Sequence, residues 1–315
     1  MNKKFIYQII SMKKYYTDDD KIIFNCKFNK PLDEYIKVIK NFKKIIFSDY
    51  NDYKLCVEKN NNYMYEYYSH YKKSKFNQHV KSALDNLTQL LKLTFSECFN
   101  QPVDKGALNN LTQLQQLAFG LCFNQPVDEG ALDNLSKLQQ LIFGFSFAQP
   151  VDEGALDNLI ELKQLTFGNK FNQPVEGALD NLSKLQRLTF GFSFAQPVKG
   201  ALNNLTQLRE LTFGESFNQE LDLPSNIKIL KLNNNNIMID NLPNSIEELY
   251  FGEYFNSELD NLPSSIKIIS FNKNSDYNKE LNNLPKSLSK LYLPEKYDIQ
   301  IININPECVI SKKVD

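Results

Sequence analysis

The residues best suited to catalysis in this chain are a few histidines and cysteines. His70 and His79 are the two histidines, and Cys56 lies upstream of both. A thiol beside an imidazole can act as a nucleophile, but such a pair also needs a group that orients the base. The surrounding sequence offers neither that group nor an oxyanion-binding motif. We therefore interpret His70, His79 and Cys56 as surface residues, and we expect no catalytic residues, no cofactor and no enzyme activity.

The five cysteines have spacings that indicate a reducing compartment. They are odd in number and form no CxxC pair, which argues against a disulfide framework. Cys98 and Cys122 lie at equivalent positions of a repeat described below, so their Cα atoms could come within disulfide reach. We expect reduced thiols. The cysteines are Cys26, Cys56, Cys98, Cys122 and Cys308.

An acidic strip is the one candidate for binding a metal ion. Carboxylates recur at one position of the repeat, yet Lys105 and Lys199 occupy the same position in other copies. A calcium site needs several oxygen ligands around one point, whereas a mixed-charge row is typical of a solvated edge. We therefore predict no metal site at Asp128, Glu129, Asp152, Glu153 and Glu176.

Composition and charge exclude several classes of protein. The 315 residues carry 36 basic and 37 acidic side chains, and 42% of them are hydrophobic. A net charge of -1 lacks the footprint of a general nucleic-acid binder. No uncharged apolar run of about 18 residues could span a membrane. The apolar run Phe5–Ile10 is too short for a typical export signal. We expect an intracellular, cytoplasmic protein, in the host cytoplasm if its source is a virus.

Internal repeats are the strongest signal in the sequence. A unit containing the step L-x-x-L-x-F recurs from Leu87 to Phe217 with spacings of 24, 24, 24, 23 and 23 residues. The step continues at shorter spacings to Leu293. All 11 glycines fall in two columns of the repeat, one after L-x-F and one after P-V. Glycine allows positive φ or close backbone approach, so the same turns must recur in unit after unit.

One unit of about 24 residues cannot bury its own apolar side, so the units must stack. The leucines recur at three and then two residues, which favours a short strand over an amphipathic helix. Stacked strands form a parallel sheet with leucine ridges inside. We also predict a phenylalanine ridge beneath the turn, and a short helical turn near Ala131–Asn134 is compatible with the pattern. The phenylalanine ridge comprises Phe99, Phe123, Phe147, Phe171, Phe194, Phe217 and Phe255.

These motifs resemble a known family of repeats. The step L-x-F-G-x-x-F-N-Q-P-V is similar to the FNIP repeat, a relative of the leucine-rich repeat, and Leu242–Phe251 resembles its common form. The resemblance covers about residues 76–293. It implies an α/β fold: a leucine-rich-repeat-like solenoid with a parallel β-sheet of short strands and with loops and short helical turns on the return side. The sequence departs from the family pattern at Ala148, Ala195, Glu220 and Glu258, and in the Asn-rich stretch Asn233–Asn236.

The two ends of the chain depart more strongly from the repeat. We predict a cap or F-box remnant at 1–21, degenerate coils at 22–75 with Tyr50 to Tyr71 as one coil, the solenoid at 76–293 and a C-terminal cap at 294–315. FNIP repeats are often joined to an F-box, which docks a substrate receptor onto a cullin-type ubiquitin ligase. The segment Phe5–Cys26 has a faintly similar pattern but lacks the opening Leu-Pro.

The outward positions of the strands form the most informative surface. Solenoids commonly bind extended partners along a curved sheet. The side chains here are mild and polar, without an arginine cluster or an aromatic ladder. We therefore predict a non-catalytic interaction scaffold with a protein partner, and a ubiquitin-ligase substrate receptor as the alternative. We expect no nucleic-acid or membrane partner. The predicted strand-face residues are Gln116, Gln140, Gln164, Arg187 and Glu210 in one row, and Ala118, Ile142, Thr166, Thr189 and Thr212 in the other.

Overall fold

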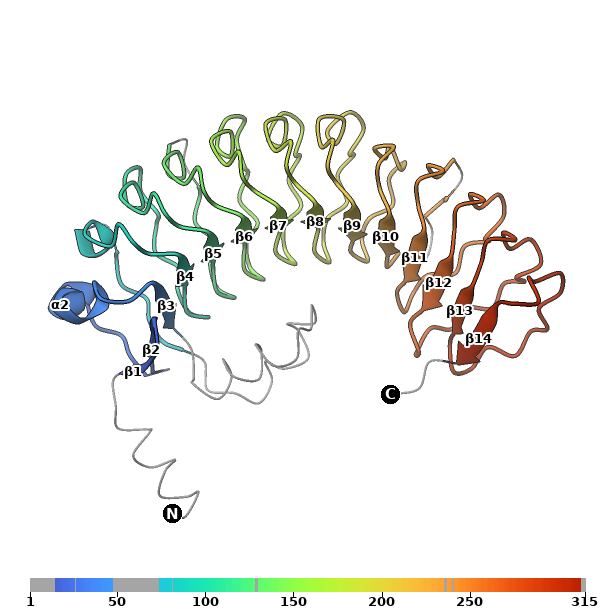
Figure 1. Cartoon of the computed structure of the whole chain (residues 1–315), viewed down its shortest axis with the longest axis horizontal. Helices are drawn as coiled ribbons and strands as arrows, with labels where there is room; N and C mark the ends of the chain where they lie inside the picture. The colour runs from blue at the N-terminus through green and yellow to red at the C-terminus, as the bar shows by residue number, and fades with distance from the viewer. Residues whose placement is uncertain are drawn as a thin grey trace, which may run out of the picture. The chain divides into compact units, whose positions relative to one another are not determined.

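The computed structural model describes most of the chain as two compact units. The described residues are 15–25, 27–47, 74–80, 82–127, 130–234, 237–239 and 241–312. The first unit lies within residues 1–149 and the second within residues 150–315. Both are built from short strands joined by long loops (Figure 1).

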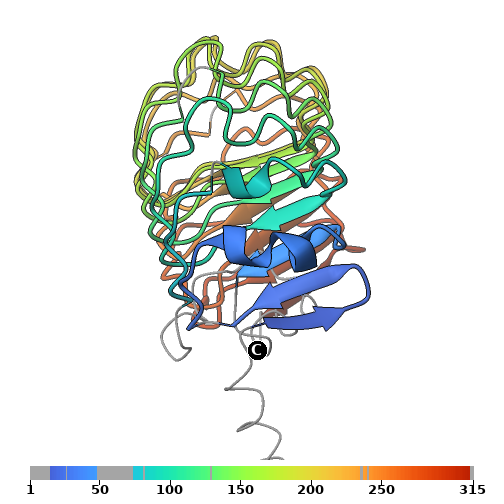
Figure 2. The same ribbon diagram turned by 90° about the vertical axis from the view of Figure 1, so that its left-hand side faces the viewer.

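The first unit begins with a hairpin and continues as a parallel sheet. Strand β1 pairs antiparallel with β2, and each later strand of the unit pairs parallel with the one before it. Helical turns lie beside the first strands (Figure 2). The elements are β1 Tyr15–Asp18, β2 Lys21–Phe24, η1 Leu32–Tyr35, α2 Ile36–Ile39, β3 Lys44–Phe47, η2 Ser82–Leu84, β4 Lys92–Thr94, β5 Gln116–Ala118 and β6 Gln140–Ile142.

The second unit is a parallel sheet in sequence order. Each strand from β7 to β14 pairs in parallel with the next. The elements are β7 Gln164–Thr166, β8 Arg187–Thr189, β9 Glu210–Phe213, β10 Ile229–Leu232, β11 Glu248–Phe251, β12 Ile268–Phe271, β13 Lys290–Leu293 and β14 Val309–Lys312.

The predicted stacking of leucine on leucine is confirmed. Leu117 faces Leu141 across β5 and β6, and Leu188 faces Leu211 across β8 and β9. All four side chains are 0% exposed. Side chains alternate along a strand, so a buried leucine requires an outward-facing residue on each side of it. The fold is thus the expected solenoid, with very little helix. Residues Ala131–Asn134 form bends and turns rather than helix.

The phenylalanines form a double column inside the solenoid. Phe99 and Phe123, on neighbouring coils, stack with ring centroids 6.1 Å apart, as predicted. Each ring also stacks on the phenylalanine that ends the strand of its own coil, with 4.0 Å between Phe119 and Phe123. The same arrangement recurs in the second unit, where the Phe190 and Phe194 centroids are 3.9 Å apart. Such ring pairs contribute about 0.5–1.5 kcal/mol each beyond their burial.

The two glycine columns serve different purposes. Gly120 has an ordinary φ, but a Cβ there would lie 1.7 Å from the Ser96 carbonyl oxygen of the preceding coil. Gly200 instead has φ +76° and open space around it. The first column therefore permits close packing of coils, and the second permits a left-handed turn.

An asparagine ladder ties successive coils together outside the strands. The Asn100 side-chain oxygen accepts a hydrogen bond from the Asn124 backbone N–H at 2.8 Å. The same oxygen accepts one from the Gln125 side chain at 3.1 Å. Residues 29 and 77 make the equivalent backbone contact at 3.0 Å, and residues 77 and 100 at 2.9 Å. The asparagines of the repeat thus satisfy backbone donors in a region without strand pairing, and the glutamine side chains donate to the same asparagine oxygens.

Ala195 interrupts this ladder in the second unit, so restoring it is expected to stabilise the protein. The Ala195 backbone N–H donates a hydrogen bond to the Asn172 side-chain oxygen. Ala195 itself offers no side-chain oxygen to the next coil, where the Gln219 side-chain amide donates to the Asn218 side-chain oxygen instead. We expect Ala195→Asn to raise the free energy of unfolding by about 1 kcal/mol, because it adds one or two hydrogen bonds. Urea denaturation measures the change. Ala195→Ser is the control, since its shorter side chain does not reach the next coil.

The predicted degenerate coil at Tyr50 to Tyr71 lies outside the described residues, and the strands on either side of it pair with each other. Strand β3 pairs directly with β4, with Lys44 opposite Lys92, although 48 residues separate them in sequence. Phe28 likewise stacks on Phe76 at 5.9 Å, as neighbouring coils do. The step from β3 to β4 in the sheet therefore spans 48 residues of sequence. Residues 48–73 themselves lie outside the described part of the chain.

The predicted domain boundaries stay predictions, although two observations bear on the ends. β1 and β2 form a hairpin, and β2 is already a strand of the parallel ladder. β14 lies inside the segment 294–315 and continues the sheet in register with β13. Residues 1–14, which carry most of the predicted cap or F-box remnant, lie outside the described residues.

Candidate functional site

The predicted strand-face residues lie side by side on neighbouring strands. In the first unit Gln116 pairs with Gln140, and Ala118 with Ile142. In the second unit Gln164, Arg187 and Glu210 form one row, and Thr166, Thr189 and Thr212 form the other. All ten residues are partly or fully exposed. The geometric prediction is thus confirmed within each unit, whereas the binding role stays a prediction.

The same rows continue in the first unit as a column of lysines. Lys21, Lys44 and Lys92 are successive partners on β2, β3 and β4. Lys21 forms an ion pair with Asp18 at 3.1 Å, and Lys44 forms one with Asp20 at 3.1 Å. Burial lowers the pKa of Lys92, and the positive charges of Lys44 and Lys21 lower it further. The three lysines give this end of the strand face positive charge. Like charges directly opposite one another cost stability.

In the second unit the rows continue beyond Glu210 and Thr212 into a more varied surface. The strands β10–β13 present apolar, charged and aromatic side chains where the earlier coils present glutamine and threonine. We call these residues the tyrosine patch. Its members are Ile229, Lys231, Glu248, Tyr250, Ile268, Lys290 and Tyr292. Ser270, which lies between the two tyrosines in their row, is buried.

The sequence-based prediction of the strand face did not include the tyrosine patch, although the L-x-F step continues through these strands. The L-x-F step repeats at Leu232, Phe251, Phe271 and Leu293, and the outward positions follow from it by counting back. Only the spacing between steps shortens, because the connecting loops are shorter. The register of β10 on β11 shows that the strands still align residue for residue.

Hydrogen bonds and charge contacts hold the tyrosine patch in place. The Lys231 ammonium lies 2.6 Å from the Glu210 carboxylate and 5.6 Å from the centre of the Tyr250 ring. The Tyr250 hydroxyl donates to the Glu248 carboxylate at 2.6 Å. Burial raises the pKa of Tyr250 above its usual value, and the bond to Glu248 adds to the increase. The ring is therefore a neutral, oriented group with one face near a cation.

Glu247 forms a three-residue charge bridge beside the tyrosine patch. Its carboxylate oxygens lie 2.8 Å from the Lys228 ammonium and 2.6 Å from the Lys267 ammonium. Hydrogen bonds from Lys228 and Lys267 lower the pKa of Glu247 from 4.5 to about 2. The side chain thus links the coils on either side of its own.

This bridge predicts a defined dependence of stability on pH. A folded-state pKa below the unfolded value means that the stabilisation is fully present above pH 4.5 and is lost as the pH falls toward about 2. We expect Glu247→Gln to remove that part of the pH dependence. Urea unfolding at several pH values between 2 and 7 tests this. An identical pH dependence in the two proteins would contradict the assignment.

Those of the other sequence candidates that the structure describes do not assemble a reactive site. His79 is exposed, and Asp152, Glu153 and Glu176 are exposed along one edge. Cys98 is partly buried and Cys122 exposed on neighbouring coils. Among the described residues no group of three His, Cys, Asp or Glu side chains could hold a metal ion. His70, Cys56, Asp128 and Glu129 lie outside the described residues.

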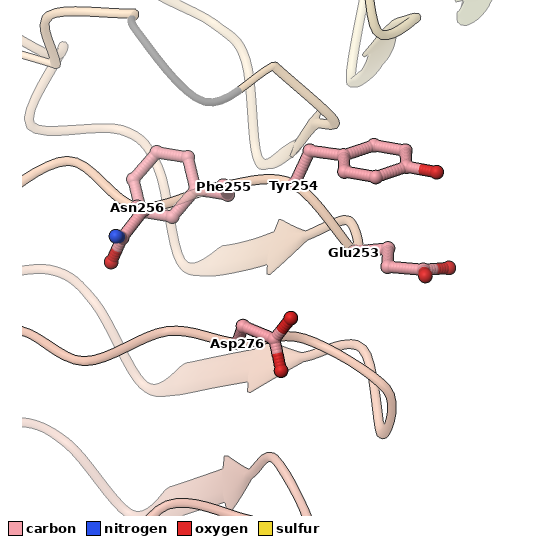
Figure 3. A pocket seen from close by; sticks show the side chains of 5 residues that line it. All are labelled: Glu253, Tyr254, Phe255, Asn256 and Asp276. Atoms are coloured by element: carbon pink, nitrogen blue, oxygen red, sulfur yellow. The ribbon is translucent and has the colours of Figure 1, made fainter.

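A shallow depression in the second unit is lined by few side chains. It has a volume of about 200 Å³ and is bordered by Glu253, Tyr254, Phe255, Asn256 and Asp276 (Figure 3). Phe255 is buried as part of the phenylalanine column, and Asp276 lies 3.1 Å from the Lys296 ammonium. These five residues include no nucleophile next to a base, so the depression offers no catalytic arrangement.

The fold and its outward rows define a leucine-rich-repeat-like solenoid. Part of the chain is similar to FNIP repeats, since the FNIP Repeat model matches residues 217–254 and 233–274. No curated protein of similar sequence was found. Among the described residues no helix is long and apolar enough to cross a membrane.

Several solved structures share this architecture. CroV588, described as a novel circular LRR protein, is 28% identical with a TM-score of 0.67 over 93% of this chain and 41% of its own. The present chain thus spans about two fifths of that protein. The internalin InlF of Listeria monocytogenes is 17% identical with a TM-score of 0.60, covering 94% of this chain and 87% of its own. A chain of the Toll–Spatzle complex from Drosophila is 12% identical with a TM-score of 0.59, covering 86% and 36%.

Proposed function

We propose that the protein is a non-catalytic scaffold that binds a protein partner on its strand face, centred on the tyrosine patch. The solenoid fold fits an interaction scaffold, because within each unit every coil adds outward-facing positions to the strand face. Tyrosine is enriched among the residues that contribute most to protein interfaces. The observation that carries the proposal is that Tyr250 and Tyr292 stand in the outward row that earlier coils fill with threonine.

The composition of the patch favours a protein partner with both apolar and charged groups. Ile229 and Ile268 lie partly exposed in the same row as Glu248, and Lys231 lies in the row of the tyrosines. Apolar contact area with charged groups nearby is the anatomy of a protein interface. The ion pair and hydrogen bonds fix the side chains before binding, which lowers the entropic cost of association.

A double variant tests this proposal. Tyr250→Ala with Tyr292→Ala removes both rings, while the buried Leu249 and Leu291 keep the strands folded. We expect a partner captured from native cells to be retained at least about tenfold less well, because each lost anchor costs 1 kcal/mol or more. Quantitative mass spectrometry followed by binding of the two purified proteins measures the loss.

Ile160→Ala provides the matched control. Ile160 is an exposed apolar residue, 53% exposed, on the return segment of the second unit. We expect its replacement to leave binding unchanged. Equal loss in both variants, or no loss in the tyrosine variant, would contradict binding on the strand face.

The alternative function is a ubiquitin-ligase substrate receptor, and it requires an F-box-like segment at the N-terminus. Residues 15–18 and 21–24 are strands of the β1–β2 hairpin, so they belong to the solenoid sheet. Deleting residues 1–14 leaves that hairpin intact. Capture of a ligase adaptor that disappears on this deletion would favour the receptor, whereas capture through the tyrosine patch alone favours the scaffold.

A further inference from the structure

The final strand of the second unit has an unpaired edge and an exposed apolar surface. β14 pairs with β13 on one side (Figure 1), and among the described residues no strand pairs with its other side. Val309 is 62% exposed, Ile310 44% and Ile302 48%. An exposed, apolar edge strand is a ready template for pairing with another strand.

The contrast with the inner strands shows what is missing at this edge. Ile310 continues the buried ridge of Leu291 and Ile269, both of which are 0% exposed. The ridge loses its cover at Ile310 because no further coil among the described residues stacks on β14. A solenoid needs a polar cap at its ends to stay soluble as a single copy.

The opposite end of the sheet is protected in a way that β14 is not. β1 turns back antiparallel on β2, and the hairpin carries the Asp18–Lys21 ion pair. Charged side chains and a short reversed strand are common means of protecting a sheet edge.

The hydrogen-bonding phase of β14 fixes which groups point outward. The Val309 N–H donates to the Ser289 carbonyl oxygen at 2.9 Å, toward β13. Backbone groups alternate in direction along a strand, so the N–H and C=O of Ile310 and Lys312 point away from β13. Residue 310 therefore has outward backbone groups and an exposed apolar side chain at the same position.

We propose that β14 pairs antiparallel with β14 of a second copy of this chain. Symmetry places Ile310 opposite Ile310 of the second copy, and Cys308 opposite its Lys312. This register brings outward backbone groups together in pairs and puts the inward side chains on one face, as antiparallel pairing requires. It also brings Glu307 near Lys312 of the second copy, whereas parallel pairing would align like charges.

A second copy suits this edge better than an unrelated strand. The edge is self-complementary in the register described, and a two-fold axis uses the same surface on both copies. With one unprotected end among the described residues, such pairing closes at two copies and does not propagate into a filament. The tyrosine patch is not part of the contact, so this inference is independent of the proposed function.

Light scattering on the full chain tests the pairing. We expect the wild-type chain to have twice the mass of a single copy at micromolar concentrations. Ile310→Pro removes an outward N–H that bonds to nothing within the described strands, so the monomer should fold and the dimer should be lost. Ile310→Val keeps that N–H and should remain dimeric. A wild-type chain that stays monomeric, or a dimer that survives Ile310→Pro, would overturn the proposal.

Cross-linking tests the register in a chain whose native cysteines are replaced by serine. Directly opposite residues of a hydrogen-bonded antiparallel pair have Cα atoms about 5.5 Å apart, which a disulfide can bridge. Ile310→Cys should therefore cross-link two copies under mild oxidation. Val309→Cys should not, because it faces Ser311 of the second copy. Cross-linking through residue 309 but not residue 310 would overturn the register.

Discussion

Leu117→Asp is expected to abolish cooperative folding of the first unit. Leu117 is 0% exposed and lies between Leu93 and Leu141 in the leucine ridge. A carboxylate at this position would be buried without a partner, and such changes cost about 4 kcal/mol or more. Each coil is stabilised mainly by its two neighbours, so the loss should spread along the stack. Thermal unfolding followed by far-ultraviolet circular dichroism measures the effect.

Gln116→Asp is the matched control, one residue away on the same strand. Gln116 is exposed on the strand face, and its neighbour on β4 is Lys92. A carboxylate there lies opposite a positive charge, so the free energy of unfolding should change by no more than about 0.5 kcal/mol. Equal destabilisation by the two substitutions would mean that the inward and outward positions are assigned incorrectly.

Gly120→Ala is expected to have the second large effect. An added Cβ would lie 1.7 Å from the Ser96 carbonyl oxygen and 2.7 Å from the Glu97 Cα. These atoms belong to the backbone of the preceding coil, so neither a rotamer change nor a small side-chain shift relieves the clash. We expect a loss of about 3 kcal/mol or more, measured by urea denaturation.

Gly200→Ala separates close packing from turn geometry. Its φ is +76°, and nothing lies within 4 Å of the added Cβ. The cost should be only the backbone strain of a left-handed residue, about 1–2 kcal/mol. If Gly200→Ala proved as harmful as Gly120→Ala, the distinction between the two glycine columns would be incorrect.

The sequence contained enough information for the stacked core. Leu141 and Phe123 lie in columns that repeat at nearly constant spacing, and a repeated buried position admits few arrangements other than stacking. From Lys44 to Lys92 the chain advances 48 residues, which matches two repeat lengths, yet β3 pairs directly with β4. Length alone does not distinguish an added coil from a long connection, because loop closure costs grow slowly with length.

The candidate binding surface was only partly predictable. The outward positions of β5–β9 follow directly from the leucine spacing, and the sheet registers confirm them within each unit. The contact of Lys231 with Tyr250 depends on residues 19 positions apart becoming neighbours. The depressed pKa of Glu247 depends on lysines from the coils before and after it. To predict such contacts, one must know which residues of successive coils lie opposite one another. The repeats of this region are shorter than the earlier ones, so this alignment is harder to read from the sequence.

The central claim is that equivalent residues of successive coils lie side by side, and a disulfide test addresses it directly. Thr189 and Thr212 are partners on β8 and β9. Adjacent strands lie about 4.8 Å apart, within disulfide reach. In a chain whose native cysteines are replaced by serine, Thr189→Cys with Thr212→Cys should cross-link on mild oxidation. Thr189→Cys with Lys231→Cys, two strands apart, should not. The reverse pattern, measured by mass spectrometry, would contradict the stacked solenoid.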